Sequence, residues 1–199
     1  TFADATSDRA TLLRHADIAM YDAKRSGSAI RLFDQSLERT STMQLSLSAD
    51  LPGAVERGDI QLYFQPQFDL RTGELIGAEG LVRWAHHEFG LLTPSTFLDL
   101  ALMSEGSAEF VRTTLRQAIA AIARSIDLGH PIPVAVNVSI ASIRDLELSS
   151  TLFADLTQHG VPPELLTLEI TENDVDRPSD AVIDALDQLR SSGITISID

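Results

Sequence analysis

From residue 58 onward, short apolar runs of strand length alternate with longer segments that have helical periodicity. The first two runs, residues 61–70 and 74–84, flank a turn at 69–73 with glycine at its end, which predicts an antiparallel pair of strands. Later strands are expected at 133–138, 165–171 and 194–199, and helices at 94–103, 108–128, 147–159 and 179–192. Because the strands are continuously apolar and alternate with helices, the pattern predicts a parallel sheet covered by helices.

The first 57 residues follow a different pattern. Residues 11–25 place apolar side chains along one helical stripe, and Gly27 ends the helix. Residues 29–33 are expected to form a short strand, and residues 34–50 a helical linker that runs into a helix at 48–57. One helix and one strand cannot form a core, so we interpret this segment as the end of a domain whose body lies upstream.

Polar residues close several of the apolar runs. They are Glu79, Asn137, Glu169 and Asp199, and they lie tens of residues apart. Carboxylate and amide oxygens in such positions fit a hard divalent cation better than a packed core. Functional residues at strand ends favour a (β/α) barrel over an open sheet. A typical barrel needs ~250 residues, so residues 51–199 would form just over half of one.

Composition narrows the class of protein. The chain has 199 residues, 44% of them hydrophobic, and a net charge of −14, which argues against DNA or RNA polymers as partners. The absence of cysteine excludes disulfides and thiolate metal sites and fits a cytoplasmic protein. No apolar run approaches the ~20 residues of a membrane span, although an anchor in segments outside this chain stays open.

Five motifs occur in an order and spacing that resemble one protein family. They are Tyr63-Phe64-Gln65-Pro66-Gln67-Phe68-Asp69-Leu70, Gly77-Ala78-Glu79-Gly80-Leu81-Val82-Arg83-Trp84, Asn137-Val138-Ser139, Leu168-Glu169-Ile170-Thr171-Glu172 and Ile198-Asp199. These motifs resemble the first part of an EAL domain, a family of cyclic di-GMP phosphodiesterases and of degenerate binders of that dinucleotide. The resemblance covers residues 51–199 and implies an α/β fold, a partial (β/α)8 TIM-type barrel of the EAL kind.

The N-terminal helix carries a second resemblance. Its residues Ala16-Asp17-Ile18-Ala19-Met20-Tyr21-Asp22-Ala23-Lys24-Arg25-Ser26-Gly27 look like the last helix of a GGDEF domain, the fold of diguanylate cyclases. The implied organisation is a helix–strand remnant of a GGDEF domain at 1–35, a helical linker at 36–50 and part of an EAL domain at 51–199. The implied partners are cyclic di-GMP, a second copy in a homodimer, and upstream GGDEF and sensory domains of the same protein.

The resemblance also implies a centre of two divalent cations, Mg²⁺ or Mn²⁺. Residues that match the ligands of the first cation are Glu79, Asn137, Glu169 and Asp199, and Asp199 would also face the second. For any one of them alone, a helix cap or turn residue is the alternative. Glu172 matches a glutamate that holds a loop over the metals, and its alternative is a charge before the helix at 179–192.

Three further residues match positions that contact the substrate. Arg83 would grip a phosphate with paired donors, with a surface ion pair as the alternative. Gln65 resembles a substrate-contacting glutamine, although a satisfied amide at the sheet edge is the alternative. Leu81 would pack beside a guanine base, and ordinary core packing is the other interpretation.

Two functions account for these residues, whereas a third, a purely structural dimerisation module, would leave the ligand set unexplained. The first is a metal-dependent phosphodiesterase that converts cyclic di-GMP to linear pGpG, and the second is an inactive EAL domain that senses the dinucleotide. Gly80 replaces the family's alanine, which should leave the ligands alone, and Leu102 replaces a frequent glutamate. The family's second aspartate, catalytic lysine and a later glutamate would lie beyond Asp199, and residues 58–199 contain no lysine. The 199-residue chain is therefore expected not to catalyse by itself.

Overall fold

The computed structural model describes residues 8–25, 28–104, 106–144, 146–170 and 179–198. The chain divides into two compact units, Thr1–Asp50 and Leu51–Asp199. The division falls inside helix α2 (Gln35–Arg57), which contains both the expected linker and the expected helix at 48–57. Among the described residues, no helix combines the length and apolar character that crossing a lipid bilayer requires.

The first unit contains helix α1 (Arg9–Arg25), which confirms the helix predicted at 11–25. Asp8 precedes it, and its Oδ1 accepts a hydrogen bond of 2.8 Å from the backbone N–H of Thr11. The strand predicted at 29–33 is wrong, because the described residues 28–34 form no strand. Ile30 and Leu32 are 80% and 63% exposed, and no described strand pairs with this segment to satisfy its backbone.

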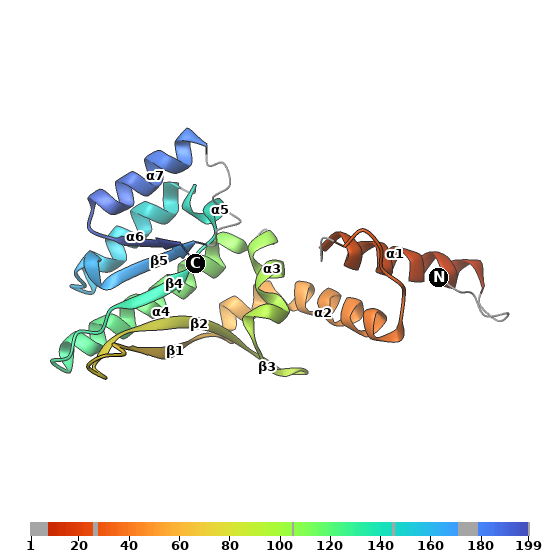
Figure 1. Ribbon diagram of the computed structural model, residues 1–199, viewed down its shortest axis with the longest axis horizontal. Helices are drawn as coiled ribbons and strands as arrows, with labels where there is room; N and C mark the ends of the chain where they lie inside the picture. Colours follow the sequence, from red (N-terminus) through yellow and green to blue (C-terminus); the bar gives the residue numbers. More distant parts are fainter. Residues whose placement is uncertain (1–7, 26–27, 105, 145, 171–178, 199) are drawn as a thin grey trace. The chain divides into compact units, whose positions relative to one another are not determined.

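The second unit is built on one sheet. Its strands are β1 (Ile60–Phe68), β2 (Leu75–His86), β3 (Gly90–Leu92), β4 (Val134–Asn137), β5 (Leu166–Ile170) and β6 (Thr195–Ile198). They follow the order β1-β2-β4-β5-β6, with β3 also beside β2 (Figure 1). β1 and β3 run antiparallel to β2, whereas β2, β4, β5 and β6 are parallel. Both the predicted antiparallel pair and the predicted parallel sheet are confirmed.

The predicted helices of this unit are also confirmed, to within one residue at each end. They are α3 (Pro94–Met103), α4 (Ser107–Asp127), α6 (Leu146–Gln158) and α7 (Asp180–Ser191). Gly129 and Gly160 follow α4 and α6 with φ of 77° and 62°, where other residues would be strained, so glycine ends these helices. The short helix α5 (Ile140–Ile143), a 3-10 turn η1 (Pro163–Leu165) and β3 were not predicted, since they are too short for a periodic pattern.

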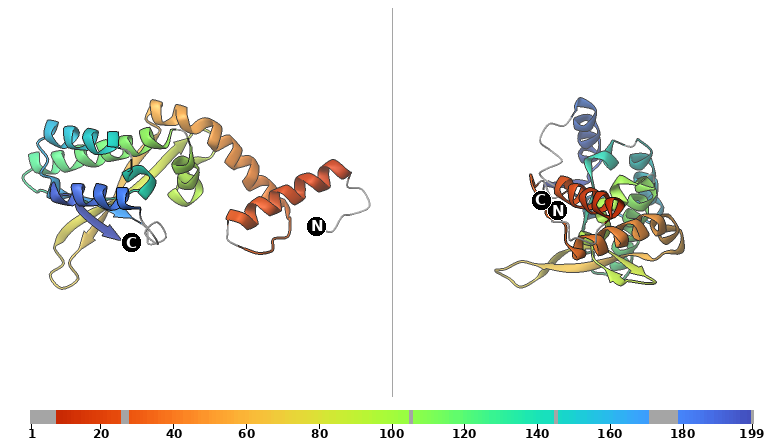
Figure 2. Two further views of the ribbon diagram at one scale, coloured as in Figure 1. Left: turned by 90° about the horizontal axis from the view of Figure 1, so that it is seen from above. Right: turned by 90° about the vertical axis from the view of Figure 1, so that its right-hand side faces the viewer.

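The register divides the side chains of the sheet between two faces. Glu79 lies opposite Ala135, Asn137 opposite Glu169, and Glu169 opposite Ser197. Because side chains alternate along a strand, odd-numbered residues of these four strands share one face and even-numbered residues share the other. The even-numbered residues of β4 and β5 are buried: Val134, Val136, Leu166, Leu168 and Ile170. Helices α4 and α7 pack against the sheet (Figure 2) and cover its even-numbered face. The polar residues therefore lie on the odd-numbered face, which these helices leave uncovered.

Helix α4 also closes part of the outer edge of β1. Ala85 N–H donates a hydrogen bond to Asp59 O, just before β1 begins. Because hydrogen-bonded pairs alternate along an antiparallel ladder, the backbone groups of odd-numbered β1 residues bond to β2, and those of even-numbered residues point to the outer edge. There the amide of Gln117 accepts from Leu62 N–H at 2.8 Å and donates to Ile60 O at 2.9 Å. One side chain thus replaces the hydrogen bonds of a neighbouring strand. Pro66, which has no N–H to donate, also occupies an outward position.

Replacing Gln117 by leucine should therefore destabilise the second unit. Gln117→Leu leaves the N–H of Leu62 and the C=O of Ile60 without these partners, which should cost about 1–3 kcal/mol of unfolding free energy. Urea unfolding followed by the fluorescence of Trp84, which lies opposite Ile60 and is 1% exposed, measures the loss. The control Gln188→Leu makes the same change on the exposed surface of α7 and should stay within ~0.5 kcal/mol of the unchanged chain. Equal losses in the two variants would contradict this role of Gln117.

Candidate functional site

Four side chains predicted to be functional lie side by side on the odd-numbered face. Gln65 of β1 is directly opposite Glu79 of β2, and Asn137 of β4 is directly opposite Glu169 of β5. Asn137 stands two residues beyond Ala135, the partner of Glu79. We refer to Gln65, Glu79, Asn137 and Glu169 as the polar row. It crosses four neighbouring strands, although its members are spread over more than a hundred residues of sequence.

The centre of the polar row is a direct side-chain contact. Asn137 Nδ2 donates to Glu79 Oε1 at 3.1 Å. Both side chains and that of Glu169 are half-buried, whereas Gln65 is exposed. Since the nitrogen of the Asn137 amide donates to Glu79, the oxygen of the amide is turned away from Glu79 and is left as an acceptor. The row therefore presents carboxylate and amide oxygens, the donors that hard divalent cations take.

Glu79 does not end a strand, contrary to the sequence expectation, and Gln65 also lies within one. Glu79 lies in the middle of β2, which continues to His86, and Gln65 lies inside β1. The reason is that β1 and β3 prolong the pairing of β2, while its parallel pairing with β4 covers only residues 78–80. Glu79 thus lies within the parallel part rather than at the end of the strand. Asn137 does end β4, and Glu169 is the penultimate residue of β5.

The turn between β1 and β2 helps to set Gln65 opposite Glu79. Asp69 Oδ1 accepts hydrogen bonds of 2.8 Å from the backbone N–H groups of both Thr72 and Arg71. These two bonds hold the pKa of the Asp69 carboxyl below its usual value, and the bond from Thr72 has the larger effect. Gly73 follows with φ of 72°, and its N–H donates to Asp69 O. The turn thereby fixes the register of the hairpin.

Arg83 and Leu81 lie farther along β2 on the same face as Glu79. Arg83 Nη1 donates to Val82 O at 2.8 Å, and its Cζ lies 5.9 Å from the centroid of the Tyr63 ring. In the described part of the chain, Arg83 forms no ion pair with a carboxylate. Tyr63 lies opposite Leu81 and is absent from the residues predicted from the sequence. Its odd-numbered position, two residues before Gln65, is the signal that could have found it.

The two remaining predicted residues, Glu172 and Asp199, lie outside the described residues. Ser197 of β6 lies opposite Glu169 and is therefore on the same face of the sheet as the polar row. Ser139, in the motif that begins with Asn137, has a structural role, because its Oγ accepts a bond of 3.2 Å from Ser142 N–H and caps α5.

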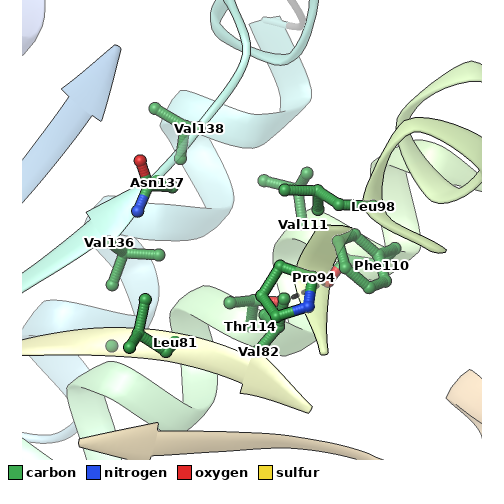
Figure 3. Close-up of a pocket in the computed structure, with 11 residues that line it drawn as sticks. Leu81, Val82, Pro94, Leu98, Phe110, Val111, Thr114, Val136, Asn137 and Val138 are labelled. Carbon is green, nitrogen blue, oxygen red and sulfur yellow. Dashed lines mark hydrogen bonds between the residues drawn. The ribbon is translucent and has the colours of Figure 1, made fainter. Parts of the chain in front are cut away.

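A small apolar cavity lies at the edge of the polar row (Figure 3). It has a volume of about 70 Å³ and is bounded by β2, β4, α3 and α4. Its lining residues are Gly80, Leu81, Val82, Pro94, Leu98, Phe110, Val111, Thr114, Val136, Asn137 and Val138. The Thr114 hydroxyl in its wall already donates a hydrogen bond to Phe110 O. Sites for small-molecule ligands usually have volumes of ~300 Å³ or more. A dinucleotide cannot enter this cavity, so the open odd-numbered face is the candidate binding surface.

Leu102, which departs from the family pattern, lines a second cavity. This cavity has a volume of about 160 Å³ and lies among α3, α4, α5 and α6. Ala141 and Ser142 of α5, the helix that follows Asn137, also line it. The leucine is therefore half-buried between helices.

A side chain at position 80 would point away from the polar row. A Cβ atom at this position would lie 2.9 Å from Leu62 Cδ2 and 3.1 Å from Leu62 Cγ. Gly80 is even-numbered and Glu79 is odd-numbered, so an alanine methyl would enter the helix-covered face rather than touch the polar row. Leu62 occupies the space that such a methyl would need.

Comparison with known proteins places this face in a family. A model described as the EAL domain matches residues 48–199. The Pseudomonas aeruginosa protein named bifunctional diguanylate cyclase/cyclic di-GMP phosphodiesterase MucR is 35% identical over 193 residues, which are 96% of this chain and 28% of that protein. NbdA of the same organism, named cyclic di-GMP phosphodiesterase, is 32% identical over 191 residues, 94% of this chain and 24% of that protein.

A solved structure gives the same result for the fold. The structure described as PaMucR phosphodiesterase in complex with c-di-GMP matches with a TM-score of 0.72 and 35% identity. The match covers 77% of this chain and 63% of that chain. The predicted partial barrel of the EAL kind is thereby confirmed. The chain spans about a quarter of the length of the curated relatives MucR and NbdA.

The contact between Gly80 and Leu62 predicts a coupled effect on stability. Gly80→Ala should cost the second unit at most about 1 kcal/mol, because the side chain of Leu62 must shift to admit the methyl while replacing a strand glycine by alanine gains roughly 0.5–1 kcal/mol. Leu62→Val should cost less in the Gly80→Ala chain than in the unchanged chain, since the smaller side chain makes room for the methyl. Urea unfolding of the two single variants and the double variant measures this coupling. If the double variant loses the sum of the two single losses in unfolding free energy, contact with Leu62 does not determine which side chain fits at position 80.

Proposed function

The chain belongs to the EAL domain family, and on that premise we propose that it supplies the metal- and substrate-binding face of a phosphodiesterase that hydrolyses cyclic di-GMP to linear pGpG. The observation that carries the proposal is the polar row, in which Glu79 and Asn137 are hydrogen-bonded and Asn137 lies opposite Glu169. The names of MucR and NbdA, both of which include cyclic di-GMP phosphodiesterase, support the same activity.

The donor chemistry of the polar row fits Mg²⁺ or Mn²⁺. Glu79 and Glu169 supply carboxylate oxygens and Asn137 an amide oxygen, and each of these side chains is half-buried. Two half-buried carboxylates on the same face of the sheet gain from a cation that neutralises their charge. A pair of bound cations would supply a nucleophilic water and neutralise the transferring phosphoryl group. The hydrogen bond from Asn137 to Glu79 holds both ligands in one orientation before the cation binds.

The same face carries the groups proposed to bind the dinucleotide. Arg83 is proposed to donate paired N–H groups to a phosphate oxygen pair. Gln65, opposite Glu79, can donate to and accept from the substrate beside the metal, and Leu81 provides an apolar surface for a base. Glu172 and Asp199 keep the roles proposed from the sequence, a loop-holding glutamate and a ligand shared with the second cation.

The upstream segment is proposed to be the end of a GGDEF domain, at residues 1–35, followed by a linker at 36–50. The similarity to MucR supports this, because it covers 96% of this chain and so extends upstream of the EAL match at 48–199. The name of MucR also includes diguanylate cyclase. A homodimer and upstream sensory domains belong to the same proposal, as does a cytoplasmic location.

Glu79→Gln tests the assignment of the polar row. The variant keeps an acceptor oxygen for Asn137 Nδ2 but removes the charge, so the fold should persist. Loss of groups that merely support metal ligands costs ~10–100-fold in affinity or activity, and loss of a ligand charge should cost at least as much. Titration with Mn²⁺, followed by the electron paramagnetic resonance signal of the unbound ion, measures the affinity. In the native full-length protein, hydrolysis of cyclic di-GMP should fall in parallel.

The matched control is Glu74→Gln, which removes the same charge from the exposed β1–β2 hairpin and should change neither measurement. Equal Mn²⁺ affinities of the two variants would contradict the metal assignment. Binding of cyclic di-GMP without linear product from the full-length protein would favour the sensor instead.

A further inference from the structure

Tyr63 has no place in the function proposed so far, yet it lies on the same face as the polar row. The Arg83 guanidinium lies over its ring, with 5.9 Å between Cζ and the ring centroid. We propose that Tyr63 is a positioning residue, whose ring holds the Arg83 guanidinium in the orientation that binds a phosphodiester anion. This rests on the proposed function, in which Arg83 binds the substrate phosphate.

The register of the hairpin brings the two side chains together. Tyr63 lies opposite Leu81, and Arg83 lies opposite Gln61. Tyr63 and Arg83 are therefore diagonal neighbours on one face of an antiparallel pair, a separation that aromatic and long side chains can bridge. The turn at Asp69 that fixes Gln65 opposite Glu79 thus also fixes Tyr63 beside Arg83.

Two different contacts hold the guanidinium. The N–H at Nη1 donates to Val82 O at 2.8 Å, which engages one of its five donors. A group held by one hydrogen bond can still rotate about that bond. The ring of Tyr63 removes this freedom, because a cation is attracted to the face of the ring. The plane of the remaining N–H donors then keeps one orientation, so that two of them can point at the same phosphate.

Core packing does not account for Tyr63. Its side chain is 45% exposed, and it lies on the face opposite to the one that α4 and α7 cover. The neighbouring Phe64 is 42% exposed and points to the other face. Phe64 therefore offers a matched control, since it is an adjacent aromatic residue of similar exposure on the other face of the strand.

The affinity for cyclic di-GMP, measured by calorimetry in EDTA so that no metal-dependent turnover occurs, tests the proposal. Tyr63→Leu should weaken binding about 3- to 10-fold, the range of a partly exposed cation–π contact. Tyr63→Phe should bind within about twofold of the unchanged chain, because the ring face is retained. Phe64→Leu, the control, should also leave the affinity unchanged. In an Arg83→Lys background, Tyr63→Leu should have no further effect, because the planar group that the ring orients is gone.

A second measurement needs no ligand. The Arg83 side-chain N–H resonance should carry a ring-current shift that Tyr63→Phe retains and Tyr63→Leu abolishes. Unchanged affinity in Tyr63→Leu, an equal loss in Tyr63→Phe, or a loss that persists in the Arg83→Lys background would each overturn the proposal. If the unchanged chain does not bind cyclic di-GMP, the proposed function is wrong, and the resonance of Arg83 then decides whether Tyr63 orients the guanidinium.

Discussion

The register between β2, β4 and β5 is the constraint on which the candidate site depends. A slip of β4 by one residue would turn Asn137 toward the helices and bring Val136 or Val138 into the polar row. Burial opposes such a slip, because Val134, Val136, Leu166 and Leu168 are each exposed by 3% or less. At roughly 25 cal/mol per Å² of apolar surface, moving even one of these side chains into water costs about 1.5–3 kcal/mol. The apolar face thus fixes the position of the polar one.

The antiparallel hairpin extends the site beyond the parallel strands. The Asp69 turn sets its register, and Gln117 fastens the start of β1 to α4 through two backbone hydrogen bonds. Leu62 and Gly80 pack together on the side away from the site. These contacts place Gln65 and Tyr63 beside β2, where they flank Glu79, Leu81 and Arg83. Most of the apparatus that positions the site therefore lies on the opposite face of the sheet or at its edge.

The sequence predicted most of this fold, because amphipathic helices and apolar strands bury their apolar residues with a regular period. It failed for residues 29–33, where an apolar run lacks a described strand to pair with. It also placed Glu79 at a strand end, since an apolar run does not reveal which neighbour a strand pairs with at each residue. The contact of Asn137 with Glu79 and the pairing of Tyr63 with Arg83 both depend on register between segments far apart in sequence or across a turn. Periodicity alone carries no such information.

The central claim is that Glu79, Asn137 and Glu169 form one cation-binding group on the face that receives cyclic di-GMP. The most direct measurement is a crystal structure of the protein grown with Mn²⁺, in which anomalous scattering locates the ion independently of any assumed site. We predict a peak within ~2.0–2.6 Å, the range of oxygen ligands around hard divalent cations, of oxygen atoms from at least two of these three side chains. A well-occupied Mn²⁺ peak elsewhere, with the polar row empty, would contradict the account.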